Sequence, residues 1–137
     1  MKLNAWKHGG IALSGFLYLQ LLSAAAGETR YSTKEMLSDC ESIVSAVKAT
    51  GDPDQIELEN TFSTEHCWGA FSSLQQVIAL RDVGAKYPLL QICASQETTL
   101  VQLIKQFDSY ARRHPEKMQE PFIKVAVAAL GSAYPCR

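Results

Sequence analysis

The sequence predicts an all-α protein: a small bundle of four to five helices that two disulfide bonds hold together. Three observations lead to this fold class. Apolar residues recur every three or four positions in four stretches, turn-forming residues separate these stretches, and the chain contains 4 cysteines. A chain of 137 residues has room for one such domain and little else.

The first 26 residues differ from the rest and predict a signal peptide. Lys2 and Lys7 form a basic start, residues 11–22 are mostly apolar, and residues 24–26 are small alanines. The apolar run is short of the roughly 20 residues that cross a bilayer, which argues against an uncleaved anchor. We expect cleavage after Ala26, no stable membrane insertion afterwards, and an exported domain of residues 27–137.

The charge balance of the remaining chain argues against a nucleic-acid partner. Two of the 13 basic residues precede residue 27, so the exported part keeps 11 of them against all 14 acidic residues. A phosphate backbone requires clustered Lys and Arg side chains. We therefore expect no nucleic-acid partner, and the mild excess of acidic residues is typical of an ordinarily soluble protein.

The first helix is predicted over residues 33–49. Ser32 and Glu35 have the spacing of a capping box, and Gly51-Asp52-Pro53 contains the residues that end a helix. Residues 52–61 lack a clear period and are predicted to form a loop. The apolar stripe of this helix consists of Met36, Leu37, Cys40, Ile43, Val44 and Val47.

The second helix is predicted to begin after Ser63, as its cap, and to continue to about residue 82. The turn residues Asp82-Val83-Gly84 then close it. Its stripe consists of Cys67, Ala70, Phe71, Leu74, Val77, Ile78 and Arg81.

The last two helices form a predicted αα-hairpin. Thr99 and Gln102 make a second capping box, and the third helix stops at His114 because Pro115 disfavours the α conformation of the residue before it. Pro121 suits the first position of the fourth helix. The two helices are expected to run antiparallel.

The cysteines are expected to be oxidised, because an exported chain with an even cysteine count favours disulfide bonds. Without a C-x-x-C spacing or paired histidines, a zinc site is not expected. Three connectivities are possible. An antiparallel hairpin places Cys93 beside Cys136, which leaves Cys40 to pair with Cys67 and link the first two helices.

No group of residues has the pattern of a catalytic or cofactor site. His66 and Cys67 are neighbours in a helix, so their side chains point about 100° apart. The acids of residues 52–59 lack the ligand spacing and glycine of a calcium loop. We therefore expect neither an enzyme nor a bound cofactor.

Two segments are candidates for contacting a partner. The first is the acidic loop of residues 52–61. The second is the apolar segment 83–92, which either lies across the bundle and buries its side chains or is a presented loop that fills a partner's cleft. Its apolar content also leaves a homodimer open. The candidate partner-binding residues are Asp54, Glu57 and Glu59 in the first segment and Tyr87, Leu89 and Leu90 in the second.

The order and spacing of several short motifs together resemble the Rap/Tai family of immunity proteins. The resemblance covers nearly the whole of residues 27–137. The motifs are Cys40, Cys67-Trp68-Gly69, Cys93, Thr99-Leu100-Val101-Gln102-Leu103, His114-Pro115-Glu116, Ala128-Ala129-Leu130 and Tyr134-Pro135-Cys136.

This resemblance implies a periplasmic protein that binds a peptidoglycan amidase effector of a type VI secretion system and blocks its active-site cleft. Such an inhibitor needs a rigid scaffold and a projecting segment, and no chemistry of its own. No contact residue of the family falls on a matched motif position, so none is transferred. The alternative is a periplasmic acid-stress chaperone, a small helical protein that loosens at low pH and exposes apolar surface.

Overall fold

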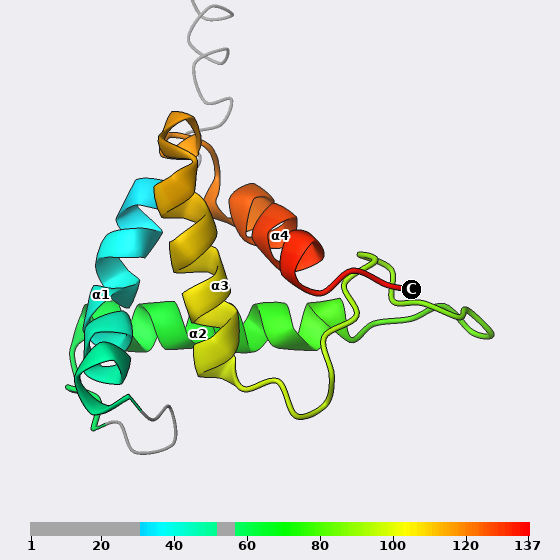
Figure 1. Cartoon of the computed structure of the whole chain (residues 1–137), viewed down its shortest axis with the longest axis horizontal. Coiled ribbons are helices and arrows are strands. Elements are labelled where there is room, and N and C mark those ends of the chain that lie inside the picture. Colours follow the sequence, from blue (N-terminus) through cyan, green and yellow to red (C-terminus); the bar gives the residue numbers. More distant parts are fainter. Residues whose placement is uncertain (1–30, 52–56) are drawn as a thin grey trace, which may run out of the picture.

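The computed structural model describes residues 31–51 and 57–137, and this part of the chain is helical without a β-strand. The all-α prediction is confirmed. In Figure 1, α2 lies across the molecule, α1 and α3 cross it, and α4 runs back along α3. The elements are α1 (Thr33–Thr50), α2 (Phe62–Ile78), α3 (Leu100–Arg113), the 3-10 turn η1 (Pro115–Lys117) and α4 (Phe122–Ala133).

The predicted signal peptide, with its cleavage after Ala26, lies outside the described residues. Within the part that the structure describes, no helix combines the length and the apolar character needed to cross a membrane.

Both predicted capping boxes are present. The Ser32 hydroxyl accepts a hydrogen bond from the Glu35 N–H at 3.3 Å, and the Glu35 carboxylate accepts one from the Ser32 N–H at 2.8 Å. Thr99 and Gln102 make the same exchange at the start of α3. These bonds satisfy main-chain donors that the first turn of a helix leaves unpaired, so they fix where α1 and α3 begin.

The bounds predicted for α2 were wrong at both ends. Thr61, not Ser63, is the N-cap, because its hydroxyl accepts the Thr64 N–H at 3.2 Å. The helix ends at Ile78 instead of residue 82, and the Leu80 carbonyl accepts a hydrogen bond from the Leu89 N–H at 2.9 Å. Arg81 therefore lies beyond the helix, in a loop that this bond closes, and does not belong to the helical stripe in which its spacing had placed it.

The core is built around three aromatic rings from three helices. Phe71 of α2 and Phe107 of α3 are fully buried, with ring centroids 5.4 Å apart. Phe122 of α4 packs on both, at 6.1 and 6.2 Å. Burying aromatic side chains of this size contributes much of the stability of a small core.

Both disulfide bonds have the predicted pairing. Cys40–Cys67 joins α1 to α2 with an S–S distance of 2.05 Å. Cys93–Cys136 joins the segment before α3 to the segment after α4 at 2.03 Å. Because α3 and α4 run in opposite directions (Figure 1), the two outer ends of the hairpin meet. The four-helix bundle is therefore covalently tied at two places.

Candidate partner-binding surface

The chain between α2 and α3 extends away from the helices as a closed loop (Figure 1). We call residues 80–89 the projecting segment. At its neck, the hydrogen bond from the Leu89 N–H to the Leu80 carbonyl joins the outgoing and returning limbs at 2.9 Å. At its outer end, the Ala85 N–H donates to the Asp82 carbonyl at 3.0 Å. These two bonds define a narrow loop with a tight turn at its tip.

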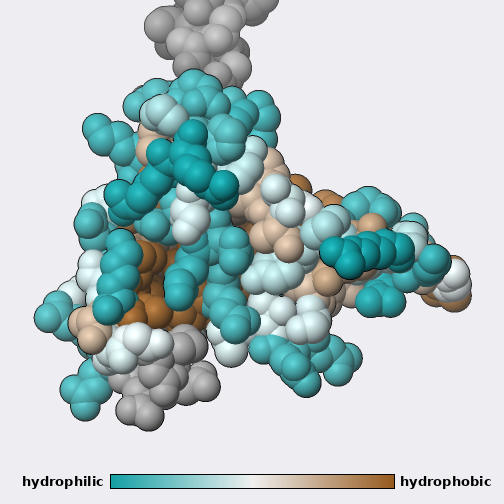
Figure 2. Space-filling view, viewed as in Figure 1, coloured by the Kyte–Doolittle hydropathy of each residue, from teal (hydrophilic) through white to brown (hydrophobic). Residues whose placement is uncertain are grey.

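The tip exposes an apolar side chain completely. Val83 lies within the tight turn and is 107% exposed relative to a reference residue. Gly84 follows with a φ of +79°, a conformation that glycine adopts without steric cost. In Figure 2 the outer end of the loop shows apolar colour, with hydrophilic side chains along its sides. Single exposed apolar side chains are common on protein surfaces. Val83 differs in its position at the tip of a closed loop, which makes it a candidate contact residue.

The base of the projecting segment is braced by the end of the chain. The Tyr87 hydroxyl donates to the main-chain oxygen of Arg137 at 2.6 Å. The Cys93 N–H donates to the Tyr134 carbonyl at 2.8 Å, beside the Cys93–Cys136 disulfide. Burial raises the pKa of the Tyr134 phenol above its ordinary value of 10. These contacts order the base of the loop before any partner arrives.

The returning limb is anchored in the core as well. Ile92 is 1% exposed and belongs to the core, and Pro88 is also buried. Between them Gln91 has a φ of +54°, which is uncommon for a residue with a side chain. Its main-chain N–H and its side-chain amide both donate to the Pro88 carbonyl, at 3.0 and 3.4 Å. This sharp reversal turns the chain from the exposed limb into the core.

Both interpretations of segment 83–92 therefore describe part of it. The inner part lies on the bundle and buries Ile92, and the outer part is presented to solvent. Of the three candidates here, Leu89 is about half exposed, Leu90 is partly buried against the core, and Tyr87 is partly buried in the brace. Val83 was not among the candidate partner-binding residues. Its position beside Gly84, in a turn predicted from the sequence, could have indicated an exposed apolar contact residue.

The acidic candidates lie at the other end of α2. Asp54 falls outside the described residues, while Glu57 and Glu59 are exposed just before the helix begins. The projecting segment follows the last residue of α2 (Figure 1). A helix of this length spans about 25 Å, so the structure separates the two candidate segments and does not bring them into one site.

His66, next to Cys67 in the sequence, is engaged in a structural contact. Its Nδ1 lies 2.6 Å from an Asp39 carboxylate oxygen, which ties α2 to α1. The Tyr31 ring packs against the imidazole in a tilted arrangement, with a centroid distance of 4.4 Å. Cys67 is bonded to Cys40. In residues 31–51 and 57–137, no three His, Cys, Asp or Glu side chains cluster to hold a metal ion.

A disulfide-tied helical domain with a braced, projecting loop has the rigidity and the presented segment that a protein-binding scaffold needs. The family model for Rap1a immunity proteins matches residues 32–136, and the chain belongs to this family. The match begins at the N-cap of α1 and ends at the last cysteine, so it includes both disulfides and the projecting segment. Comparison with curated proteins found no match, and comparison with solved structures found none either.

Family membership gives the chain an immunity role, and an immunity protein acts by binding a cognate effector.

Proposed function

We propose that this protein is an exported, non-enzymatic inhibitor of a peptidoglycan amidase effector delivered by a type VI secretion system. In this proposal the projecting segment enters the active-site cleft of the amidase and occludes it. The observation that carries the proposal is the fully exposed Val83 at the tip of a closed and braced loop.

The shape and rigidity of the projecting segment support occlusion of a cleft. Active sites of enzymes are concave and mostly apolar, so a narrow loop with an apolar tip is their complement. Transfer of a valine side chain from water to such a site contributes roughly 1.5 kcal/mol or more. Because the neck and base are ordered in the free protein, little conformational entropy remains to be lost on binding.

An exported location is supported by two independent features. Residues 1–26 have the composition of a signal peptide, and the four cysteines form two disulfides. Disulfide bonds form and persist in the periplasm and other oxidising compartments. We therefore propose the periplasm as the site of action, where an effector that cuts peptidoglycan would also act.

The direct test is a titration of the protein into the amidase encoded by the neighbouring gene, followed by an assay of cell-wall hydrolysis. We expect tight binding and loss of hydrolysis. Val83→Asp places a charge at the tip, and we expect at least about 30-fold weaker binding, as for an interface hot spot. Because Val83 is solvent-exposed, thermal unfolding of this variant should match that of the wild type.

The matched control reverses two charges at the other end of α2. Glu57→Lys with Glu59→Lys should leave inhibition unchanged if the projecting segment makes the contact. If the double variant loses inhibition while Val83→Asp retains it, the acidic loop is the contact surface. If the wild-type protein neither binds nor inhibits the neighbouring amidase, the proposed target is wrong.

The sequence leaves a homodimer open, and the described residues offer a candidate contact surface for it. An apolar groove of about 540 Å³ runs between α2 and α4, where Val77 and Ile123 are 44% and 47% exposed. Light scattering during size-exclusion chromatography measures the molar mass of the protein in solution and so gives its oligomeric state. A dimer that becomes a monomer on Ile123→Asp would place the contact here, and a monomeric wild type at high concentration would reject the dimer.

A further inference from the structure

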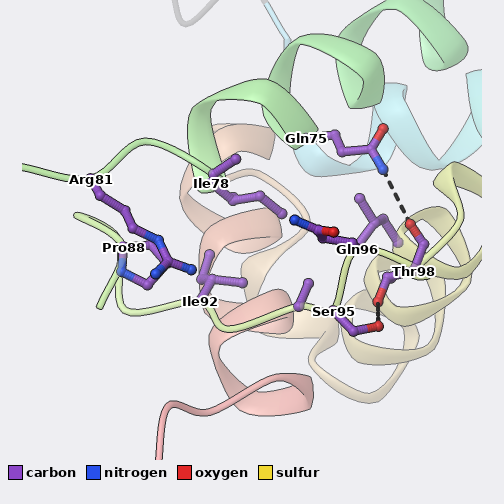
Figure 3. A pocket seen from close by; sticks show the side chains of 11 residues that line it. Gln75, Ile78, Arg81, Pro88, Ile92, Ser95, Gln96 and Thr98 are labelled. Carbon is purple, nitrogen blue, oxygen red and sulfur yellow. Dashed lines mark hydrogen bonds between the residues drawn. The ribbon is translucent and has the colours of Figure 1, made fainter. Parts of the chain in front are cut away.

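A second concave site lies at the base of the projecting segment. The C-terminal end of α2 and the connection to α3 enclose a cavity of about 430 Å³ (Figure 3). Volumes in this range hold small ligands. Neither the sequence motifs nor the proposed inhibition of an amidase uses this cavity.

Among the residues that the structure describes, Arg81 is the only charged side chain that lines the cavity, and no described Asp or Glu lines it. The guanidinium makes no ion pair or hydrogen bond with another residue of the described chain. Figure 3 shows it extending past Pro88 toward Ile92, into the cavity. A guanidinium presents a planar fork of N–H donors that matches the two oxygens of a carboxylate.

Gln96 approaches the cavity from the opposite wall. Its amide points toward the side of the cavity from which Arg81 extends (Figure 3), and it too lacks a hydrogen bond among the described residues. The other polar groups are already paired: the Gln75 amide donates to the Thr98 carbonyl at 3.2 Å, and the Ser95 and Thr98 hydroxyls are 3.1 Å apart. Among the described polar side chains that line the cavity, the two without a hydrogen-bond partner are therefore the guanidinium of Arg81 and the amide of Gln96.

The floor between these two donors is apolar. Ile78 is 5% exposed and Ile92 is 1% exposed, and both belong to the core. A ligand that accepts hydrogen bonds from Arg81 and Gln96 and also packs on the apolar floor must carry a carboxylate next to a short aliphatic group. The end of a peptide chain whose last residue has a small apolar side chain, such as alanine, has this composition.

We propose that this cavity is a binding site for the C-terminal carboxylate of a short peptide that ends in a small apolar residue. Arg81 pairs with the carboxylate, Gln96 donates a further hydrogen bond, and the terminal side chain rests on Ile78 and Ile92. The site requires no amidase. It is therefore independent of the proposed inhibitory function.

The test is an NMR titration of the isotope-labelled, oxidised protein with three capped peptides. N-acetyl-Ala-Ala has the terminal carboxylate, its C-terminal amide lacks the charge, and N-acetyl-Glu-methylamide carries a carboxylate on a side chain. We expect N-acetyl-Ala-Ala to shift the Arg81 Nε and Gln96 amide signals in a saturable manner. The uncharged amide should shift neither.

Two variants assign the effect to Arg81. Arg81→Gln should weaken binding of N-acetyl-Ala-Ala by at least about tenfold, because a hydrogen-bonded ion pair is lost. Lys86→Gln removes a cation from the same loop that lies over the Tyr87 ring and does not line the cavity, so it should leave the affinity unchanged. Both substituted residues are exposed, and unfolding curves verify that the variants remain folded.

Three results would overturn the assignment. Equal shifts with the uncharged amide would show that the carboxylate is not recognised, and the absence of any shift at ~20 mM peptide would exclude a useful site. Tighter binding of N-acetyl-Glu-methylamide would retain the carboxylate site but reject a chain terminus as its ligand. Because no effector is present, failure here leaves the test of amidase inhibition unaffected.

Discussion

The Tyr87 hydroxyl donates a hydrogen bond to the main-chain oxygen of Arg137 at 2.6 Å, across 50 residues of sequence. This bond ties the returning limb of the projecting segment to the tail that Cys136 holds in place. The loop that the proposed function depends on is therefore supported by the last residues of the chain.

Removal of this hydroxyl should loosen the projecting segment. We expect Tyr87→Phe to speed amide hydrogen exchange in residues 80–89 while lowering the free energy of unfolding by only ~1 kcal/mol, the usual net contribution of one hydrogen bond. Mass spectrometry of exchanged peptides measures the effect. Tyr110→Phe, on α3, is the matched control and should leave exchange in residues 80–89 unaltered. Unchanged exchange in Tyr87→Phe would mean that the hydroxyl does not brace the loop.

The two disulfides should have similar effects on global stability and different effects on the projecting segment. They close loops with sequence separations of 27 and 43 residues. The chain-entropy estimate for loops of this size is about 3.5–4 kcal/mol each. Replacing either pair by serines should lower the free energy of unfolding, measured in urea, by up to this amount.

Only the Cys93→Ser/Cys136→Ser variant should also increase exchange in residues 80–92, because only this bridge lies at the base of the loop. The Cys40→Ser/Cys67→Ser variant is the control. Equal exchange in both variants would contradict a local role for Cys93–Cys136.

The aromatic core offers a comparison of buried and exposed phenylalanines on one helix. Phe71 is 0% exposed, whereas Phe62, at the first position of α2, is 78% exposed. Phe71→Ala should cost about 3–5 kcal/mol, from lost burial and the cavity left behind. Phe62→Ala should change stability by less than about 0.5 kcal/mol. Guanidinium unfolding curves measure both; similar losses would mean that Phe62 packs in solution.

The capping box of α1 should make stability depend on pH. The pKa of Glu35 is lowered from 4.5, mainly because the Ser32 main-chain N–H and then its hydroxyl donate to the ionised carboxylate. A lowered folded-state pKa means that this stabilisation is complete above the unfolded value and is lost as pH falls through the folded value.

Glu35→Gln retains an acceptor for the Ser32 N–H but removes the ionisation. The variant should be less stable than the wild type at neutral pH, and the difference should shrink toward about pH 3. Urea unfolding at several pH values measures it. A difference independent of pH would show that the charge of Glu35 does not contribute.

Acid titration also separates the proposed inhibitor from the alternative chaperone. The chaperone hypothesis requires apolar surface to open at about pH 2–3, detected by fluorescence of a hydrophobic dye, together with suppression of client aggregation. We expect an inhibitor tied by two disulfides to bind little dye there. Strong dye binding with protection of clients would favour the chaperone.

The helix starts and the buried faces of the helices could be predicted from the sequence, because local interactions determine them. The Ser32–Glu35 and Thr99–Gln102 boxes act over three residues, and apolar periodicity identifies helical faces before they are packed. The pairing of Cys93 with Cys136 followed from one further inference, that two helices joined by a short turn run antiparallel.

The features of the proposed partner-binding surface were decided only by the tertiary structure. α2 ends at Ile78, and the hydrogen bond from the Leu89 N–H to the Leu80 carbonyl closes a loop outside the helix. This loop contains Arg81 and the fully exposed Val83. A hydrogen bond between residues nine positions apart leaves no period in the sequence. Whether an apolar residue lies in the core or on the surface depends on which other parts of the chain pack against it. Here Ile92 is buried by the rest of the chain, and Val83 is fully exposed to solvent.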